Sequence, residues 1–388
     1  MEKIKILAVD DELDMEDLIR QKFRRKIRSG EYNFIFAHNG IEALAQFIEH
    51  PEIGLILSDI NMPEMDGLTL LSKVNELKNP SLKTIIVSAY GDMENIRTAM
   101  NRGAFDFVTK PINFEDLEVT IEKTLNEIKH FRKSQYEHDQ LVSIQQDLNV
   151  AREIQQSILP QVFPPFPEKT EFEIFASMDA AKSVGGDFYD FFLIDDDHLG
   201  FVMADVSGKG VPAAIFMAVS RTLIRATALK GISPDECLEY ANNLLCKESM
   251  DSMFVTVFYG ILNIKTGEIK YTNAGHNPPY LIKKDGSLAE VESTGDIVLG
   301  AMEEFPFKIK TMTIEPGDTF FTFTDGVNEA MNINFEEYTD ARLIEVLKTN
   351  AGANPKELIK KVVNDVKEFT TGAEQSDDIT TLAFKFFG

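Results

Sequence analysis

The chain has 388 residues, enough for two or three domains with sizeable cores, and 44% of them are apolar. That apolar content is typical of folded protein and excludes a largely disordered chain. The formal net charge of −24 repels phosphate backbones and anionic lipids, so we expect neither nucleic acid nor a membrane surface as a partner.

We expect a cytoplasmic protein. The apolar run Ile4–Val9 is short and is followed at once by acids, which is unlike a signal peptide. The most apolar stretch, Met253–Leu262, is too short to cross a bilayer. Cys237 and Cys246 lie nine positions apart, on opposite faces of one expected helix, so we expect free thiols and a reducing compartment.

Apolar runs and amphipathic stretches alternate over residues 1–122. The runs have the length and composition of buried parallel strands, and they are Ile4–Val9, Gly54–Ser58, Thr84–Val87 and Phe105–Thr109. The stretches between them, of which Glu12–Ile27 is the first, have helical periodicity. This alternation predicts a doubly wound α/β domain with a parallel sheet, whose ligands gather at the carboxyl ends of the strands.

Polar residues follow these runs at the positions where the strands should end. They are Asp10, Asp11, Asp59, Ser88 and Lys110. Clustered carboxylates repel one another unless a hard cation lies between them, and oxygen ligands suit Mg²⁺. With the cation bound, Asp59 can attack phosphorus, and Lys110 and Ser88 can bind the added phosphoryl oxygens. Taken alone, Asp10-Asp11 would be an ordinary helix N-cap, but its alignment with the other strand ends favours the metal site.

This segment resembles the CheY-like receiver domain of two-component response regulators over its whole length, including the loop Asn61–Gly67. The resemblance implies that Asp59 is the phosphoacceptor and that a histidine kinase is the partner. It implies that the Mg²⁺ ligands are Asp10, Asp11, Asp59 and the backbone carbonyl of Asn61. It also implies that the switch residues are Ser88, Phe107 and Lys110.

Ile112–Leu159 runs for 48 residues without glycine or proline and predicts a helix of about 70 Å. Two sets of mostly apolar residues recur there at heptad spacing, namely Phe114, Leu117, Ile121, Ile128 and Phe131, then Leu141, Ile144, Leu148, Ala151, Gln155 and Ile158. The polar segment Ser134–Gln140 separates them. A solvated spacer is the alternative, but the repeating seam favours a dimerising coiled coil over residues 123–160 that transmits a signal.

Residues 161–388 predict a strand-rich α+β domain without a basic recognition helix. The expected strands are Phe172–Met178, Leu199–Ala204, Met253–Asn263, Glu268–Asn273, Pro279–Lys284, Phe307–Ile314, Thr319–Thr324 and Asp378–Phe387. Val211–Leu229 and Pro355–Thr370 predict helices. A further helix opens at Ser233–Glu236, where a hydroxyl cap precedes proline.

Acids stand beside glycine or at strand ends in this segment, and they are Asp187, Asp205, Asp325, Asp377 and Asp378. An isolated Asp-Gly pair is ordinary turn material. If these acids meet, however, they can hold two cations about 4 Å apart, which activate a bridging water for displacement at phosphorus. Gly185–Phe188 lacks the glutamate of a GGDEF signature, and Ser207–Gly210 lacks the first glycine and final hydroxyl of a P-loop.

From Ala151 onward the chain resembles the metal-dependent phosphatases of the protein phosphatase 2C superfamily. It resembles most the bacterial stage II sporulation protein E branch, which regulates sigma factors, and the matching motifs are Ala151–Pro160, Asn273–Pro279 and Thr324–Ala330. The resemblance implies two Mn²⁺ or Mg²⁺ ions with these ligands: Asp187 bridging both, Asp205 and the Val206 carbonyl on one, Asp325 and Asp377 on the other, and Asp378 adjacent. Ser207 stands where the animal enzymes carry a proposed general acid, so water or Lys209 would protonate the leaving group.

We therefore expect a homodimeric response regulator whose phosphorylated receiver controls a metal-dependent protein serine/threonine phosphatase. The resemblance implies phosphoserine or phosphothreonine on an anti-anti-sigma-type protein as the substrate. The alternative is a catalytically silent phosphatase-fold adaptor that binds a sigma-factor regulator or a sigma factor. The sequence leaves open the substrate, the cognate kinase, the preferred metal and the sign of regulation.

Overall fold

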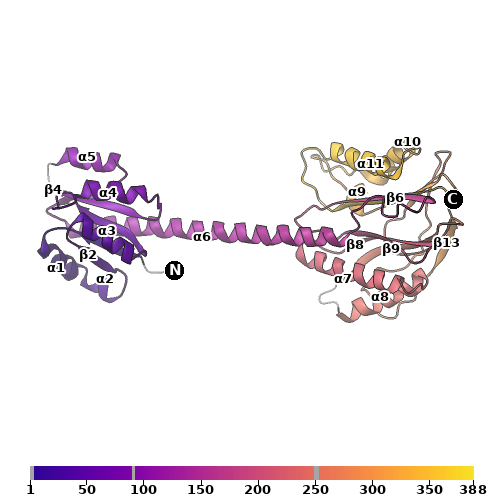
Figure 1. Ribbon diagram of the computed structural model, residues 1–388, viewed down its shortest axis with the longest axis horizontal. Coiled ribbons are helices and arrows are strands. Elements are labelled where there is room, and N and C mark those ends of the chain that lie inside the picture. Colours follow the sequence, from indigo (N-terminus) through magenta and orange to yellow (C-terminus); the bar gives the residue numbers. More distant parts are fainter. Residues whose placement is uncertain (1–3, 90–91, 249–252) are drawn as a thin grey trace. The chain divides into compact units, whose positions relative to one another are not determined.

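The computed structural model describes residues 4–89, 92–248 and 253–388 (Figure 1). It contains two compact units, Met1–Ile144 and Gln145–Gly388, and each has its own hydrophobic core.

The first unit is a five-stranded parallel sheet in the order β2-β1-β3-β4-β5. Its strands are β1 (Lys5–Val9), β2 (Phe34–Ala37), β3 (Ile53–Asp59), β4 (Lys83–Ala89) and β5 (Asp106–Lys110). Its helices are α1 (Leu13–Lys22), α2 (Arg24–Arg28), α3 (Gly40–Glu49), α4 (Gly67–Glu76) and α5 (Met93–Asn101). Side chains from both faces of the sheet form separate core clusters, because helices cover each face. The predicted doubly wound fold is confirmed.

Two details of this unit differ from the expectation. The helix predicted over Glu12–Ile27 is divided into α1 and α2 at Phe23, whose ring turns into the core and packs on Tyr32 and Phe34. The strand β2 has no counterpart among the predicted runs.

Helix α6 (Phe114–Ile158) extends over 45 residues, close to the predicted span. Leu117, Ile121 and Ile128 are buried in the core of the first unit, so most of the first heptad set packs against the receiver-like sheet. The predicted assignment of these residues to a coiled-coil seam does not hold. By contrast, Leu141 and Ile144 are 67% and 55% exposed and present apolar surface.

The second unit is a sandwich of two five-stranded sheets, ordered β13-β10-β9-β8-β7 and β12-β11-β14-β15-β6. Its strands are β6 (Phe172–Asp179), β7 (Phe188–Leu193), β8 (His198–Val206), β9 (Val255–Asn263), β10 (Glu268–Ala274), β11 (Tyr280–Ile282), β12 (Leu288–Glu290), β13 (Lys310–Thr313), β14 (Thr319–Phe323) and β15 (Ile379–Phe386). Phe201 from one sheet packs edge-on against Phe320 and Phe384 from the other, and these rings fill the space between the sheets.

Helices flank this sandwich on both sides (Figure 1). The helices α7 (Val211–Ala228) and α8 (Pro234–Glu248) cover the first sheet, and α10 (Thr339–Thr349) and α11 (Pro355–Phe369) cover the second. The short helix α9 (Asp325–Asn328) follows β14. The predicted α+β architecture is confirmed, although β7, β12, α9 and α10 were not predicted and the strand expected over Phe307–Ile314 shortens to β13.

Among the described residues, α7 is the one helix with the length and apolar composition of a membrane span. It contacts β7, β8 and α8, and Met217 and Ile224 are buried against the sandwich, as in a helix that covers a sheet. Cys237 and Cys246 both lie on α8 as free thiols, as expected.

Candidate functional sites

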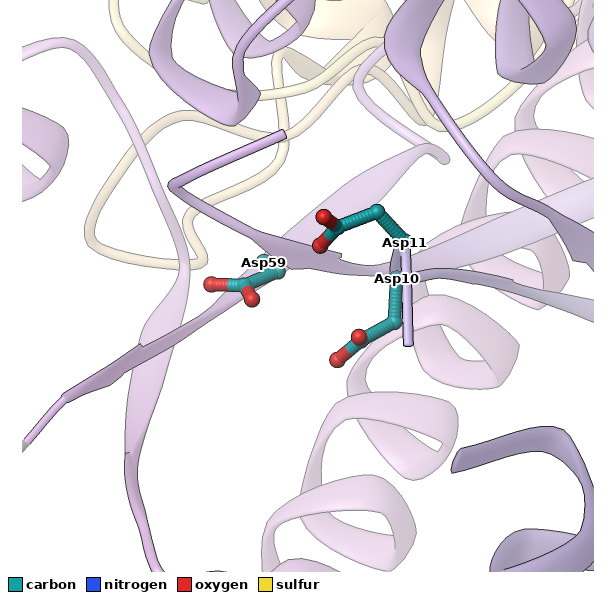
Figure 2. A group of neighbouring side chains, drawn as sticks. All are labelled: Asp10, Asp11 and Asp59. Carbon is teal, nitrogen blue, oxygen red and sulfur yellow. The ribbon is translucent and has the colours of Figure 1, made fainter. Parts of the chain in front are cut away.

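The carboxyl ends of the parallel strands bring three acids together in the first unit. Asp10 and Asp11 follow β1, and Asp59 is the last residue of β3. One carboxylate oxygen from each lies within 4.8 Å of the others, and Figure 2 shows the three side chains turned to the same side. The spacing suits one small cation with oxygen ligands.

Lys110, at the end of β5, is the cation that faces these acids. Its Nζ atom lies 2.7 Å from Asp59 Oδ2, 3.0 Å from Asp10 Oδ2 and 3.0 Å from Glu12 Oε1. Burial alone would lower the pKa of Lys110, but hydrogen bonds to the three carboxylates raise it, so the ammonium stays charged. Burial raises the pKa of Asp10. Three acids thus share one ammonium, and Asp11 adds a fourth carboxylate beside them, so the excess negative charge favours a divalent cation. Glu12 was not predicted as a site residue.

The other residues predicted for this site lie around Asp59. The amide of Asn61 is 3.4 Å from Asp59 Oδ1. Ser88 on β4 is fully buried and donates a hydrogen bond of 3.5 Å to Asp92 Oδ2, while Phe107 on β5 is 37% exposed. Their positions at neighbouring strand ends suit the predicted switch roles, which remain predictions.

The acids of the second unit come from both sheets and meet at one end of the sandwich. Asp187 precedes β7 and Asp205 lies near the end of β8, whereas Asp325 begins α9 directly after β14. Asp377 precedes β15, which pairs with β14. A hydrogen bond of 2.6 Å from Thr324 Oγ1 to Asp187 Oδ2 joins the two sheets at this point.

The electrostatics of these acids show how closely they interact. Burial and the charges of Asp205 and Asp378 raise the pKa of Asp187, whose residue is 1% exposed. Burial and the charge of Asp325 raise the pKa of Asp205 to about 7. Burial and the charge of Asp377 raise the pKa of Asp325. Repelling buried carboxylates of this kind fit a site for cations, because bound cations offset the repulsion.

These acids are spaced more widely than the trio of the first unit. Within the described ranges, Asp10, Asp11 and Asp59 form the one group of three or more acids whose ligand atoms all lie within 4.8 Å of one another. A wider spacing suits two separate cations better than one shared cation.

Asp378 holds the loop that carries Asp187. Its carboxylate accepts hydrogen bonds from the backbone N–H groups of Ala181 at 2.8 Å, Gly186 at 2.7 Å and Asp187 at 3.4 Å. A Cβ atom at Gly185 would lie 2.2 Å from Asp378 Oδ2, which explains the glycine. The predicted place of Asp378 beside the ligands rather than among them remains a prediction.

Lys209 pairs with the second acid cluster. It lies between Gly208 and Gly210, whose φ angles of 87° and 81° favour glycine. Its Nζ atom is 2.7 Å from Asp377 Oδ2 and also donates to the carbonyl of Ser376. Ser207 Oγ instead accepts the N–H of Phe254 at 3.0 Å, which makes that hydroxyl part of the loop.

The end of α6 contacts the loop that carries Asp187, which the sequence analysis missed. Gln155 Nε2 donates to the Gly185 carbonyl at 2.7 Å, and its Oε1 accepts the Gly185 N–H at 3.1 Å. Arg152 donates to the carbonyls of Ser183 at 2.7 Å and Lys182 at 3.0 Å. The prediction that Gln155 belongs to a dimer seam is therefore wrong for this side chain, since it is buried within its own unit. The motif Ala151–Pro160, which resembles the helix of related phosphatases, includes both Arg152 and Gln155 and could have indicated this contact.

His276 has a structural role in the second unit. Its Nδ1 atom is 2.9 Å from Thr256 Oγ1, and its backbone N–H donates to Asn273 Oδ1 at 2.8 Å. Burial lowers the pKa of His276 to about 4, so the ring is neutral near pH 7. A neutral, buried imidazole stabilises the turn after β10.

Comparison with known families decides the identity of both units. The family described as response regulator receiver domain matches residues 6–122, and the family described as stage II sporulation protein E (SpoIIE) matches residues 195–387. The chain joins a response regulator receiver domain to a SpoIIE-type phosphatase domain. The two predicted resemblances are confirmed.

Relatives share parts of this arrangement. Protein IcfG of Synechocystis sp. is 33% identical over 264 residues, which cover 61% of this chain and 41% of IcfG. Phosphoserine phosphatase RsbU of Bacillus subtilis is 29% identical over 255 residues, which cover 64% of this chain and 74% of RsbU. The SiaA-PP2C domain of Pseudomonas aeruginosa aligns with a TM-score of 0.56 at 22% identity, over 63% of this chain and 98% of that domain. The similarity to the SiaA-PP2C domain shows the fold of the phosphatase domain. The match to IcfG spans less than half of the length of IcfG.

Proposed function

We propose that this protein is a response regulator whose phosphorylated receiver domain controls a metal-dependent protein serine/threonine phosphatase. The observation that carries this proposal is the convergence of Asp187, Asp205, Asp325 and Asp377 from both sheets onto one end of the sandwich. The name of the relative RsbU supports a phosphoserine substrate. We place that phosphoserine or phosphothreonine on an anti-anti-sigma-type protein.

In the receiver domain, Asp59 accepts a phosphoryl group from a histidine kinase. The donor set suits Mg²⁺, and its ligands would be Asp10, Asp11, Asp59 and the carbonyl of Asn61. The Lys110 ammonium, 2.7 Å from Asp59, neutralises a phosphoryl oxygen. The Ser88 hydroxyl then turns toward the phosphoryl group, and Phe107 on the adjacent strand follows it.

In the phosphatase domain, two Mn²⁺ or Mg²⁺ ions would be held by the acids at the end of the sandwich. Asp187 would bridge them, with Asp205 and the Val206 carbonyl on one ion and Asp325 and Asp377 on the other. When bound, such ions supply a hydroxide nucleophile and neutralise the phosphate. Thr324 orients the Asp187 carboxylate by its 2.6 Å hydrogen bond, and Asp378 fixes the backbone on either side of Gly186.

Hydrolysis of an aryl phosphate in the presence of Mn²⁺ separates this function from the silent adaptor. The phosphatase proposal requires turnover that chelation removes, because the nucleophile depends on the metal. A well-folded protein that shows no metal-dependent turnover would favour the adaptor instead.

We further propose that α6 forms a coiled coil in a homodimer and links the receiver domain (1–122) to the phosphatase domain (161–388). The apolar surface of Leu141 and Ile144 supports this, since both side chains are more than half exposed in the single chain. The buried ends of α6 leave the middle of the helix as the place where a second copy would pack.

Replacement of the phosphoacceptor tests the receiver chemistry. Asp59→Asn is expected to abolish phosphoryl transfer from acetyl phosphate, because an amide is no nucleophile toward phosphorus. Intact-mass measurement would report the added phosphoryl group. Asp14→Asn, at an exposed position on α1, is the matched control and should be labelled like the wild type. An acid-labile phosphoryl group on Asp59→Asn would contradict the assignment.

Replacement of Lys209 tests its role toward the substrate. Its ammonium lies at the rim of the acid cluster and is 40% exposed, where it can bind a phosphate oxygen. Lys209→Gln is therefore expected to raise KM for an aryl phosphate about tenfold, the value of one charge-assisted hydrogen bond. Lys230→Gln, beyond the far end of α7, is the control. Steady-state kinetics with unchanged KM in Lys209→Gln would exclude this role.

A further inference from the structure

A pocket of about 530 Å³ lies beside the end of α6, and none of the acids of the second cluster lines it. Arg152, Gln155 and Leu159 form one wall, residues 175–178 of β6 form another, and Lys356 in the first turn of α11 closes it. The volume is that of a typical small-molecule site.

The charge of this pocket is opposite to that of the protein. The chain carries 63 acidic residues and a net charge of −24, yet no Asp or Glu is among the described residues that line the pocket. Two cations line it, Arg152 and Lys356. Because no carboxylate in the wall neutralises them, the pocket attracts anions.

The remaining walls are aromatic and amide-bearing. The rings of Phe163 and Phe175 lie 4.6 Å apart, and Lys356 Nζ is 5.7 Å from the centre of the Phe175 ring. Gln156 and Ser177 add hydrogen-bonding groups at the edge. A cation over an apolar wall matches a ligand with an anionic group on an apolar or aromatic body.

We propose that this pocket binds a small organic anion, that is, a carboxylate, phosphate or sulfonate carried on an apolar or aromatic body. Arg152 and Lys356 contact the anionic group, and the rings of Phe163 and Phe175 pack against the body.

The pocket also shares a wall with the loop that carries Asp187. Gln155 and Met178 line the pocket and both approach Gly185, through two hydrogen bonds and through a Met178 Cε atom 2.8 Å from the position of a Cβ. Arg152 lines it while donating to Ser183. An anion that draws the Arg152 guanidinium away from the loop therefore changes the position of Asp187. The expected effect on hydrolysis rests on the proposed phosphatase function.

Binding of 8-anilinonaphthalene-1-sulfonate to the full chain tests the proposal, because this probe joins a sulfonate to aromatic rings. Lys356→Gln is expected to weaken binding about threefold to tenfold in a fluorescence titration, as loss of one partly screened ion pair would. Lys360→Gln, one turn further along the exposed face of α11, should bind the probe like the wild type. Equal affinities in all three proteins would overturn the proposal.

A second measurement localises the probe. The chain contains no tryptophan, so Phe163→Trp places a single reporter in the pocket wall. The probe should quench this tryptophan with the affinity of the titration, and adding Lys356→Gln should shift the quenching curve by the same factor. A curve that Lys356→Gln leaves unchanged would place the probe elsewhere and overturn the site.

Aryl phosphate hydrolysis with and without the probe tests the effect on catalysis. If the probe changes the rate in the wild type and in Lys360→Gln but changes it less in Lys356→Gln, the coupling between the pocket and the Asp187 loop is supported. An unchanged rate in the wild type overturns this coupling. The binding measurements do not require activity. Failure of the proposed phosphatase function would therefore appear as binding without any basal hydrolysis.

Discussion

Asp325→Asn is expected to lower metal-dependent hydrolysis of an aryl phosphate by about 100-fold or more, beyond the usual cost of losing an outer-shell partner of a metal. Besides burial, the charge of Asp325 raises the pKa of Asp205, and the charge of Asp377 raises the pKa of Asp325, so these carboxylates lie close together. An amide in its place offers only a neutral oxygen, so a cation at this position is bound less tightly and supplies less hydroxide. Asp187→Asn is expected to have at least the same effect.

The matched control is Asp285→Asn, because Asp285-Gly286 is also an Asp-Gly pair in the same domain. The Asp285 carboxylate accepts the N–H of Ser287 at 2.9 Å and its hydroxyl at 2.6 Å, as turn residues do. Its replacement should leave the rate within about twofold of the wild type. Mn²⁺ affinity from calorimetry and circular dichroism would accompany the kinetics. Wild-type turnover in well-folded Asp325→Asn would show that this acid, too, is only a turn residue.

Both acid clusters could be predicted because strand ends are visible in the sequence. A buried strand such as β3 is a continuous apolar run, and Asp59 is the residue at which that run stops. The same holds for Asp325, which follows the apolar run of β14 after one residue, Thr324. Parallel order then places the ends of β1, β3 and β5 at one edge without any knowledge of side-chain contacts.

The errors arose where two structures produce the same sequence pattern. Over a few turns, heptad spacing in a coiled coil and the 3.6-residue period of a helix packed on a sheet cannot be distinguished. Leu117 and Ile121 fit the seam but are buried against the receiver sheet. Gln155 also fits the seam, yet its two hydrogen bonds to Gly185 join residues 30 positions apart, and no local pattern predicts such a contact.

The strand β7 was missed for a related reason. Its sequence Phe188–Leu193 is an apolar run interrupted by Asp190, and it follows closely on Gly185-Gly186, a pair typical of turns. In the structure, Asp190 is buried, and Arg221 and Arg225 on α7 offset the cost of burying its charge by pairing with it at 3.0 and 2.7 Å. A charged residue can be buried in a strand when its partners are far away in the sequence, and a local sequence pattern does not reveal those partners.

An insertion of five residues within 134–140 is expected to uncouple phosphatase activity from phosphorylation of Asp59, whereas an insertion of seven residues retains most of the response. At about 100° per residue, seven residues return the helix to within about 20° of its original phase, but five leave it about 140° out of phase. Residues 134–140 are all exposed, so neither insertion disturbs the packing of Ile128 or Gln155. The five-residue insertion rotates one buried end of α6 relative to the other and lengthens the helix by about 7.5 Å, whereas the seven-residue insertion lengthens it by about 10.5 Å with little rotation.

The comparison of five with seven residues separates a rigid helix from a flexible tether. The closure entropy of a tether changes by much less than 1 kcal/mol between these lengths, so a tether would treat both insertions alike. The measurement is the rate of aryl phosphate hydrolysis with and without beryllofluoride, which occupies the place of the phosphoryl group on Asp59. Asp59→Asn in each background shows which part of the response depends on the receiver. Equal responses from both insertions would mean that α6 only tethers the domains, and a lost response with seven residues would mean that its length matters as well as its phase.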